Sequence, residues 1–262
     1  MLGRVAVQIS EEDPEYLSYA KAITSKLGLS PHFLYVKREH PIERFCQTFQ
    51  KSLEEKQNAI RRAVHSIFGD VHFLTLYGDG EKVLTDIKEN YDLLFVKYNR
   101  RVLGESIPEW LVSETDELRF WVYKDGAKVD IKKACLPVDF SERSLKQVEF
   151  ADTLRKFFDF EFQLVHLVNI GRLKGKLSGK DYKKSLLDKE EETKHMYTDL
   201  FGDRELNLVL LEGDPYRELV KYINTWDYDL VIVGRRGRGM KEQIGSVSLH
   251  LMRRLKCPVV VL

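Results

Sequence analysis

The sequence has little of what several classes of protein need. Its 262 residues include only three cysteines, Cys46, Cys135 and Cys257, and its 42 basic residues nearly balance 41 acidic ones, for a formal net charge of +1. Three widely spaced cysteines fit neither a disulfide framework nor a zinc pattern, and they suit a reducing cytoplasm. A nearly neutral chain has no general field to attract nucleic acid. We therefore expect a globular cytoplasmic protein, and no nucleic-acid partner beyond a local basic patch.

Long hydrophobic runs are also missing. Residues 4–9 form a strand pattern rather than the apolar core of a signal peptide. No other apolar run approaches the length of a membrane-spanning helix. The sequence therefore predicts no membrane association.

What the chain does contain is an internal repeat. Residues 71–96 and residues 206–233 both show a strand, a Gly-Asp pair, an amphipathic helix, a Tyr-Asp pair and a buried strand. The strands that open the two halves, at residues 5–10 and 134–139, also match. The repeat predicts a tandem duplication, with domains at residues 1–126 and 127–262.

Strand and helix patterns alternate in each half, which predicts an α/β fold with a mostly parallel sheet and helices on both faces. In the first half we expect a long charged helix at residues 41–67. In the second half we expect a glycine- and lysine-rich loop at residues 169–180. In the second half we predict strands at 132–138, 161–168, 206–211, 229–233 and 257–262, and helices at 142–158, 179–201, 214–225 and 245–256.

The most informative stretch runs from residue 229 to residue 262. Its apolar strand stops at Gly234, and Gly237 and Gly239 follow before Gly245 and Ser246 open a helix. Glycine allows tight turns and close approach of the backbone to a ligand. The start of a helix directs N–H groups and a positive dipole end at an anion. The spacing matches neither a P-loop nor a dinucleotide fingerprint, but it predicts a phosphate site.

These residues resemble the universal stress protein family, whose pattern is Gly, two residues, Gly, nine residues, Gly-Ser/Thr. Here Gly234 and Gly237 keep the first spacing, and only seven residues separate Gly237 from Gly245. The resemblance implies an adenine nucleotide alpha hydrolase-like fold for each half, with a doubly wound five-stranded parallel sheet in the order 3-2-1-4-5. It also implies that the fifth strands, at residues 118–123 and 257–262, pair edge to edge in an intramolecular pseudo-dimer. Further assembly into a homodimer stays open.

The resemblance further implies that the second half binds an adenine nucleotide, with ATP expected, with or without Mg²⁺. Pro137, Val138 and Leu167 would then lie against the base, and residues 245–248 would hold phosphates through N–H and hydroxyl donors. The predicted nucleotide contacts are Pro137, Val138, Asp139, Leu167, Val233, Gly234, Gly237, Arg238, Gly245, Ser246, Val247 and Ser248.

Several of these roles have alternatives. Asp139 could accept a hydrogen bond from the nucleotide or cap the following helix. His166 fits a satisfied core histidine better than a ligand. The basic residues Arg235, Arg236, Arg238 and Lys241 could neutralise phosphates or simply be solvated. Two missing loop residues remove up to about 7 Å of chain, so the site could favour a monophosphate or diphosphate, bend ATP differently, or have lapsed.

The first half lacks this chemistry. Ser10 stands where the second half has Asp139, and residues 96–100 lack the glycines that follow the corresponding strand in the second half. Residues 104–106 retain only a trace of the Gly-Ser motif. We expect a degenerate, structural domain that binds no nucleotide, in which Trp110 and Trp121 pack between domains.

No Ser-His-Asp, Cys-His, paired-carboxylate or metal-ligand pattern is visible, so we expect no catalytic or metal-binding residues. The resemblance implies a stress-response protein that binds an adenine nucleotide as a sensor or stabilising ligand, and the missing catalytic patterns predict that it is not an enzyme. The alternatives are an interaction scaffold that needs no nucleotide and a slow ATPase. The sequence implies a protein partner without identifying it.

Overall fold

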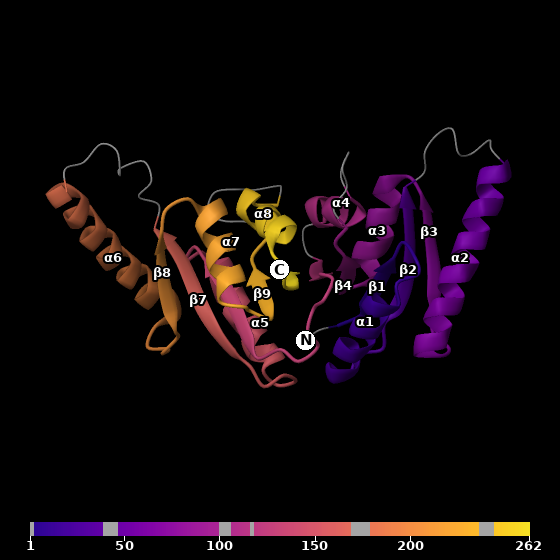
Figure 1. Ribbon diagram of the computed structural model, residues 1–262, viewed down its shortest axis with the longest axis horizontal. Helices are drawn as coiled ribbons and strands as arrows, with labels where there is room; N and C mark the ends of the chain where they lie inside the picture. The colour runs from indigo at the N-terminus through magenta and orange to yellow at the C-terminus, as the bar shows by residue number, and fades with distance from the viewer. Residues whose placement is uncertain (1–2, 39–46, 100–105, 116–117, 169–178, 236–243) are drawn as a thin grey trace. The chain divides into compact units, whose positions relative to one another are not determined.

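The computed structural model of this chain divides into two compact units, residues 1–129 and residues 130–262. It describes residues 3–38, 47–99, 106–115, 118–168, 179–235 and 244–262 (Figure 1). The division lies close to the one expected between residues 126 and 127. Strands and helices alternate through both units, as the sequence predicts.

The first unit is a parallel sheet in the order β3-β2-β1-β4-β5. Its strands are β1 (Val5–Ile9), β2 (His32–Arg38), β3 (Phe73–Gly78), β4 (Leu93–Lys97) and β5 (Arg119–Tyr123). Its helices are α1 (Pro14–Lys26), α2 (Gln47–Phe68), α3 (Gly80–Asn90) and α4 (Ile107–Glu114). The helix predicted from residue 41 is observed from Gln47, and residues 41–46 lie outside the described ranges.

The second unit repeats this topology in the order β8-β7-β6-β9-β10, again all parallel. Its strands are β6 (Lys133–Val138), β7 (Glu161–Val168), β8 (Leu208–Glu212), β9 (Leu230–Val233) and β10 (Val259–Val261). Its helices are α5 (Glu142–Leu154), α6 (Gly179–Phe201), α7 (Pro215–Thr225) and α8 (Ser246–Arg254). The predicted fold class and strand order are therefore confirmed for both halves.

Helix α5 ends four residues before the predicted position, residue 158. The backbone N–H groups of Phe157 and Phe158 both donate to the Leu154 carbonyl, at 2.9 and 3.0 Å, which tightens the chain into a turn. Most of the expected loop, residues 169–178, lies outside the described residues. The helix predicted at 179–201 has the observed limits of α6.

The repeated Tyr-Asp pair has the same role in both units. The Asp92 carboxylate accepts a hydrogen bond from the Arg4 N–H at 2.7 Å, just before β1. The Asp229 carboxylate accepts from the N–H groups of Lys132 and Lys133, at 2.9 and 3.0 Å, at the start of β6. Each aspartate thus joins the beginnings of two neighbouring strands, so the repeat reflects a shared structural need.

In the second unit, strand order reverses around β6. The chain passes from β6 to β7 and β8 on one side, then returns to β9 and β10 on the other. Right-handed crossovers place α5 and α6 on one face and α7 and α8 on the other (Figure 1). The carboxyl ends of β6 and β9 therefore flank the crevice where doubly wound sheets bind ligands. Within the described ranges, no helix combines the length and apolar character needed to cross a bilayer.

Candidate functional site

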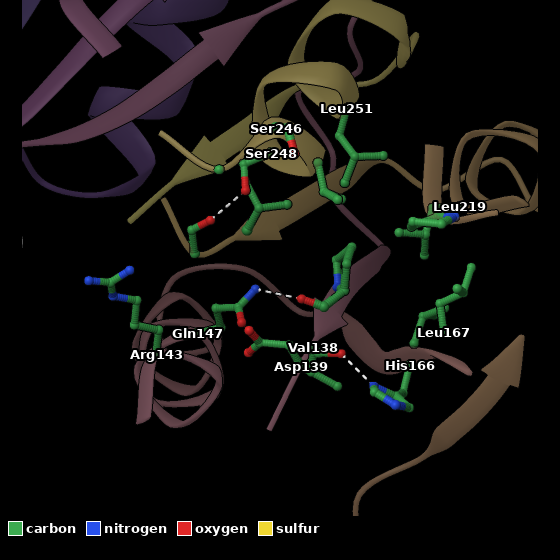
Figure 2. Close-up of a pocket in the computed structure, with 17 residues that line it drawn as sticks. Val138, Asp139, Arg143, Gln147, His166, Leu167, Leu219, Ser246, Ser248 and Leu251 are labelled. Atoms are coloured by element: carbon green, nitrogen blue, oxygen red, sulfur yellow. Dashed lines mark hydrogen bonds between the residues drawn. The ribbon is translucent and has the colours of Figure 1, made fainter. Parts of the chain in front are cut away.

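A cavity of about 270 Å³ opens at this crevice in the second unit (Figure 2). Its walls come from the ends of β6, β7 and β9 and from the first two turns of α5, α7 and α8. Its volume is near the lower end of the roughly 300–1,000 Å³ typical of small-molecule sites. Ten of the twelve predicted contacts line it: Pro137, Val138, Asp139, Leu167, Val233, Gly234, Gly245, Ser246, Val247 and Ser248. The other two, Gly237 and Arg238, lie outside the described residues.

One side of the cavity is apolar. Val138 of β6, Val165 and Leu167 of β7, and Leu219 of α7 come together there from three elements. Val138 and Leu219 are buried, and Leu167 is half-buried with its side chain toward the cavity (Figure 2). A flat, weakly polar ring could displace water from this wall with a hydrophobic gain.

Strands β6 and β9 are bridged beside the crevice by Gln147, a residue that the sequence analysis missed. Pairing of β6 with β9 runs only as far as Cys135 opposite Val231. Beyond it, the Gln147 amide of α5 donates to the carbonyls of Pro137 at 3.0 Å and Ile232 at 2.8 Å. Proline has no N–H to continue a ladder, so the side-chain amide satisfies carbonyls from both strands. The sequence offers no local signal for this role, because the burial of Gln147 and its two acceptors are set by the tertiary fold.

The turn after β6 is built around Asp139. Its Oδ1 accepts hydrogen bonds from the Ser141 N–H at 3.1 Å, the Ser141 hydroxyl at 2.7 Å and the Ser144 hydroxyl at 3.1 Å. Between them, Phe140 adopts a φ of 56°, which is uncommon for a bulky residue. Asp139 thus lines the cavity and bonds to residues at the start of α5, where Ser141 rather than Asp139 is the N-cap. Its hydrogen bond to a nucleotide stays a prediction.

His166 lines the cavity beside this turn and is half-buried rather than a core residue. Its Nδ1 lies 2.8 Å from the Val138 carbonyl, and its ring packs against Phe140 with centroids 4.7 Å apart. Because a carbonyl can only accept, Nδ1 carries the proton in this contact. The histidine is therefore oriented by β6 and faces the apolar side of the site.

At the opposite end of the cavity lies the start of α8. Its N-cap is Gly245, and among the described residues no side chain caps this helix. The first N–H groups of a helix have no acceptor within it and carry the positive end of its dipole. The Gly245 N–H itself donates to the Arg235 carbonyl at 2.6 Å, joining the two ends of the intervening loop. This end of the cavity suits an anion.

Two hydroxyl groups at this end differ in what they can offer a ligand. Ser248 donates to the Gly234 carbonyl at 2.7 Å, so its proton is already used and the expected phosphate donor is not available in this arrangement (Figure 2). Ser246 instead accepts from the Tyr216 hydroxyl at 2.8 Å and retains its own proton. Tyr216 of α7 was not predicted, because its place beside α8 depends on helix packing.

Of the four basic loop residues expected near the phosphates, the structure describes only Arg235. Arg235 is 2% exposed, so the solvated alternative is wrong for this residue. Arg236, Arg238 and Lys241 lie outside the described residues. A different cation, Arg143 in the first turn of α5, lines the cavity and was not predicted.

The first unit supplies a negative charge of its own at the matching helix start. Ser106, the N-cap of α4, accepts from the Glu109 N–H at 3.3 Å, and the Glu109 carboxylate accepts from the Ser106 N–H at 3.0 Å. The same carboxylate accepts from the Tyr98 hydroxyl at 3.2 Å. At these two helix positions the second unit has Gly245 and Ser248. An internal carboxylate thus occupies α4 where α8 is left open.

Lys97 stands at the end of β4, where the second unit has Gly234. Its ammonium group pairs with Asp13 and, at 2.8 Å, with Asp125. Burial disfavours the charged form of Lys97, but the bonds to Asp125 and Asp13 outweigh it and raise its pKa above the usual range. Burial likewise opposes ionisation of Asp13, yet the bond from Lys97 and the Tyr16 N–H together lower its pKa. The end of β4 is therefore filled by an ion-pair network.

Two further groups of this region, Ser10 and Trp121, have bonding partners within the first unit. Ser10, at the position of Asp139, accepts from the Gln8 amide at 2.9 Å. Trp121 stacks on Phe95 with centroids 5.3 Å apart and donates to the Tyr19 hydroxyl at 3.0 Å. Trp121 therefore has partners inside its own unit, whereas packing between domains stays a prediction.

Comparison with known proteins agrees with this geometry. The model of the universal stress protein family matches residues 130–262, just over half of the chain. The universal stress protein MJ0531 of Methanocaldococcus jannaschii is 26% identical over 137 residues, which cover 50% of this chain and 81% of that protein.

Two solved structures share the fold over both units. A universal stress protein from Archaeoglobus fulgidus has a TM-score of 0.70 at 16% identity, covering 100% of this chain and 96% of its own. A protein from Pseudomonas aeruginosa, described as a putative universal stress protein, has a TM-score of 0.63 at 13% identity, covering 99% and 93%. With the family match, the duplicated sheet and the cavity at its switch point, the chain belongs to the universal stress protein family as a tandem two-domain member.

Proposed function

We propose that the second unit binds an adenine nucleotide, with ATP as the expected ligand, and that the nucleotide acts as a sensor or stabilising ligand in a stress response. One observation carries the proposal: a single cavity joins an apolar wall to an uncapped helix start. A nucleotide has the same two ends, a flat base and an anionic phosphate. Asp139 and His166 lie between these ends and offer polar contacts to a ribose or to the edge of a base.

The first unit takes a structural role in this proposal. A phosphate at α4 would meet the carboxylate of Glu109, and Lys97 fills the position at which Gly234 lets a ligand approach. The negative charges of the phosphate and of Glu109 would repel each other, and the ion pairs of Lys97 would have to be broken to admit the ligand. We therefore propose one nucleotide per chain, which isothermal titration calorimetry measures directly as a stoichiometry near one.

We propose binding without rapid turnover. The Asp139 carboxylate accepts from the first turn of α5, and the proton on His166 Nδ1 is directed at a backbone carbonyl, so both groups have structural tasks. Incubation with MgATP followed by chromatography should recover the nucleotide intact. Phosphate release that disappears in Asp139→Ala would instead support the slow ATPase.

The decisive test is thermal denaturation with and without MgATP. Ligand at about 100 times its dissociation constant stabilises the folded state by about 2.7 kcal/mol, which raises the melting temperature measurably. Gly245→Val places a branched side chain at the phosphate end of the cavity and should abolish this rise. Lys221→Val puts the same side chain at an exposed position of the same unit and should keep it. Equal melting temperatures for all proteins, with and without MgATP, would favour the nucleotide-independent scaffold.

Three further parts of the proposal are the cellular location, a protein partner and the oligomeric state. The thiols of Cys135 and Cys257 are free, which fits the reducing cytoplasm that we propose as its location. We propose that a protein partner binds the second unit preferentially when the nucleotide is bound. Light scattering with and without MgATP would show whether the chain also forms a homodimer.

A further inference from the structure

Arg143 is a cation with no evident structural task. It lies in the first turn of α5, lines the cavity and is half-buried. Among the residues that the structure describes, no acidic side chain forms an ion pair with its guanidinium. The start of a helix is also the end at which its dipole disfavours a positive charge. Its position therefore contributes little to folding and suggests a role in binding.

Helix geometry places Arg143 at the mouth of the crevice. Gln147, four residues later on the same face of α5, bridges Pro137 and Ile232 at the bottom of the crevice. One helical turn rises about 5.4 Å, and α5 begins at the carboxyl edge of the sheet. Arg143 thus lies about one turn above that bridge, and its side chain leads away from the Asp139 carboxylate (Figure 2).

The negative charge of a bound phosphate and of Asp139 would exceed the positive charge at the start of α8. A terminal phosphate brings about −1.5 to −2 charges at pH 7, and Asp139 adds a further negative charge to the lining. The α8 dipole offers the equivalent of roughly +0.5 charge. The helix end alone leaves a large negative excess, which a guanidinium reduces while also donating up to two parallel hydrogen bonds to phosphate oxygens.

We infer that Arg143 is the phosphate-specificity residue of this site and clamps a phosphate of the ligand against the start of α8. The inference rests on the proposed nucleotide function and assigns its anion selectivity to α5, a rigid helix, rather than only to the loop after β9. The site then binds adenosine weakly and phosphate-bearing ligands much more tightly.

The test is calorimetric titration of the full-length protein with adenosine, AMP, ADP, ATP and inorganic pyrophosphate. Loss of one charge-assisted bond corresponds to about 10–100-fold in affinity. Arg143→Gln should therefore weaken AMP, ADP, ATP and pyrophosphate by about that factor and leave adenosine unchanged. Arg143→Lys should retain part of the affinity. Lys146→Gln removes the same charge from an exposed position of α5 and should bind as the wild type does.

A second readout separates binding from folding. Without ligand, Arg143→Gln should melt at or slightly above the wild-type temperature, because it removes a cation from a helix start. Wild-type affinity for all phosphates in this variant, or equal weakening of adenosine, would overturn the role of Arg143. If the wild type binds pyrophosphate through Arg143 but no adenine compound, the nucleotide function fails while the anion site stands. If the wild type binds none of the probes, both fail.

Discussion

Replacing Gln147 by methionine tests the physical basis of the crevice. Gln147 is 2% exposed, and its amide is the donor to the Pro137 and Ile232 carbonyls at 3.0 and 2.8 Å. Methionine has a similar volume and little polarity, so Gln147→Met removes both hydrogen bonds without opening a large void. A buried polar group left without a partner costs about 1–3 kcal/mol. Unpaired carbonyls lie toward the lower end of that range because such oxygens are tolerated better than N–H groups.

The two losses together should lower the free energy of unfolding of the second unit by about 2–4 kcal/mol. For a domain of this size, 1 kcal/mol shifts the melting temperature by roughly 3–5 °C, so we expect a decrease of about 6–20 °C. Circular dichroism follows the melting, and hydrogen exchange of β6 and β9 locates the change. Lys146→Met, on the exposed side of the same helix, is the matched control and should shift stability by no more than about 0.5 kcal/mol.

Replacing Gln147 by glutamate should make the stability of the second unit depend on pH. Gln147→Glu replaces the amide donor with a carboxylate that faces two carbonyl oxygens, so only its protonated form can hydrogen-bond to them. Its pKa in the folded state should therefore rise above the ordinary glutamate value of about 4.3. The associated stability is complete below that value and is lost as the pH rises through the folded-state pKa. A Gln147→Met protein as stable as the Lys146→Met control would refute the bridge as a structural element.

Three further predictions concern an ion pair, a helix cap and a hydroxyl group. Asp13→Asn keeps a capping oxygen but removes the ion pair with Lys97, so the free energy of unfolding of the first unit should fall by about 1–3 kcal/mol at pH 7. Because the pKa of Asp13 is lowered in the fold, the difference in stability between wild type and variant, measured by urea unfolding, should persist down to about pH 4 and shrink below it. Glu109→Ala removes the carboxylate that accepts from the Ser106 N–H at the start of α4 and from the Tyr98 hydroxyl, and it should cost about 1–3 kcal/mol, whereas an unchanged melting temperature would contradict the internal cap. Tyr216→Phe removes the bond that orients Ser246 and should weaken nucleotide binding about 2–10-fold in calorimetry, with stability nearly unchanged because Tyr216 is 37% exposed.

The glycine spacing located the proposed phosphate end of the cavity, because glycine and helix-start signals are local. Gly234, Gly245 and Ser246 line the cavity where the sequence analysis expected them. The same reasoning could not recognise Gln147, since a glutamine within a helix gives no sign of which carbonyls it will meet. Nor could it tell that Ser248 would donate to Gly234, because that choice depends on the position of a strand fourteen residues earlier.

The sequence by itself determined the duplication, the order of strands and helices, and the absence of the glycine motif from the first half. These features follow from periodicity and residue type, which act over a few neighbouring positions. Only the tertiary structure decided that Glu109 and Lys97 fill the first crevice, that Gln147 bridges the second, and that Arg143 stands at its mouth. Each of these depends on atoms brought within hydrogen-bonding or ion-pairing reach by folding, and such pairings leave no periodic trace in the chain.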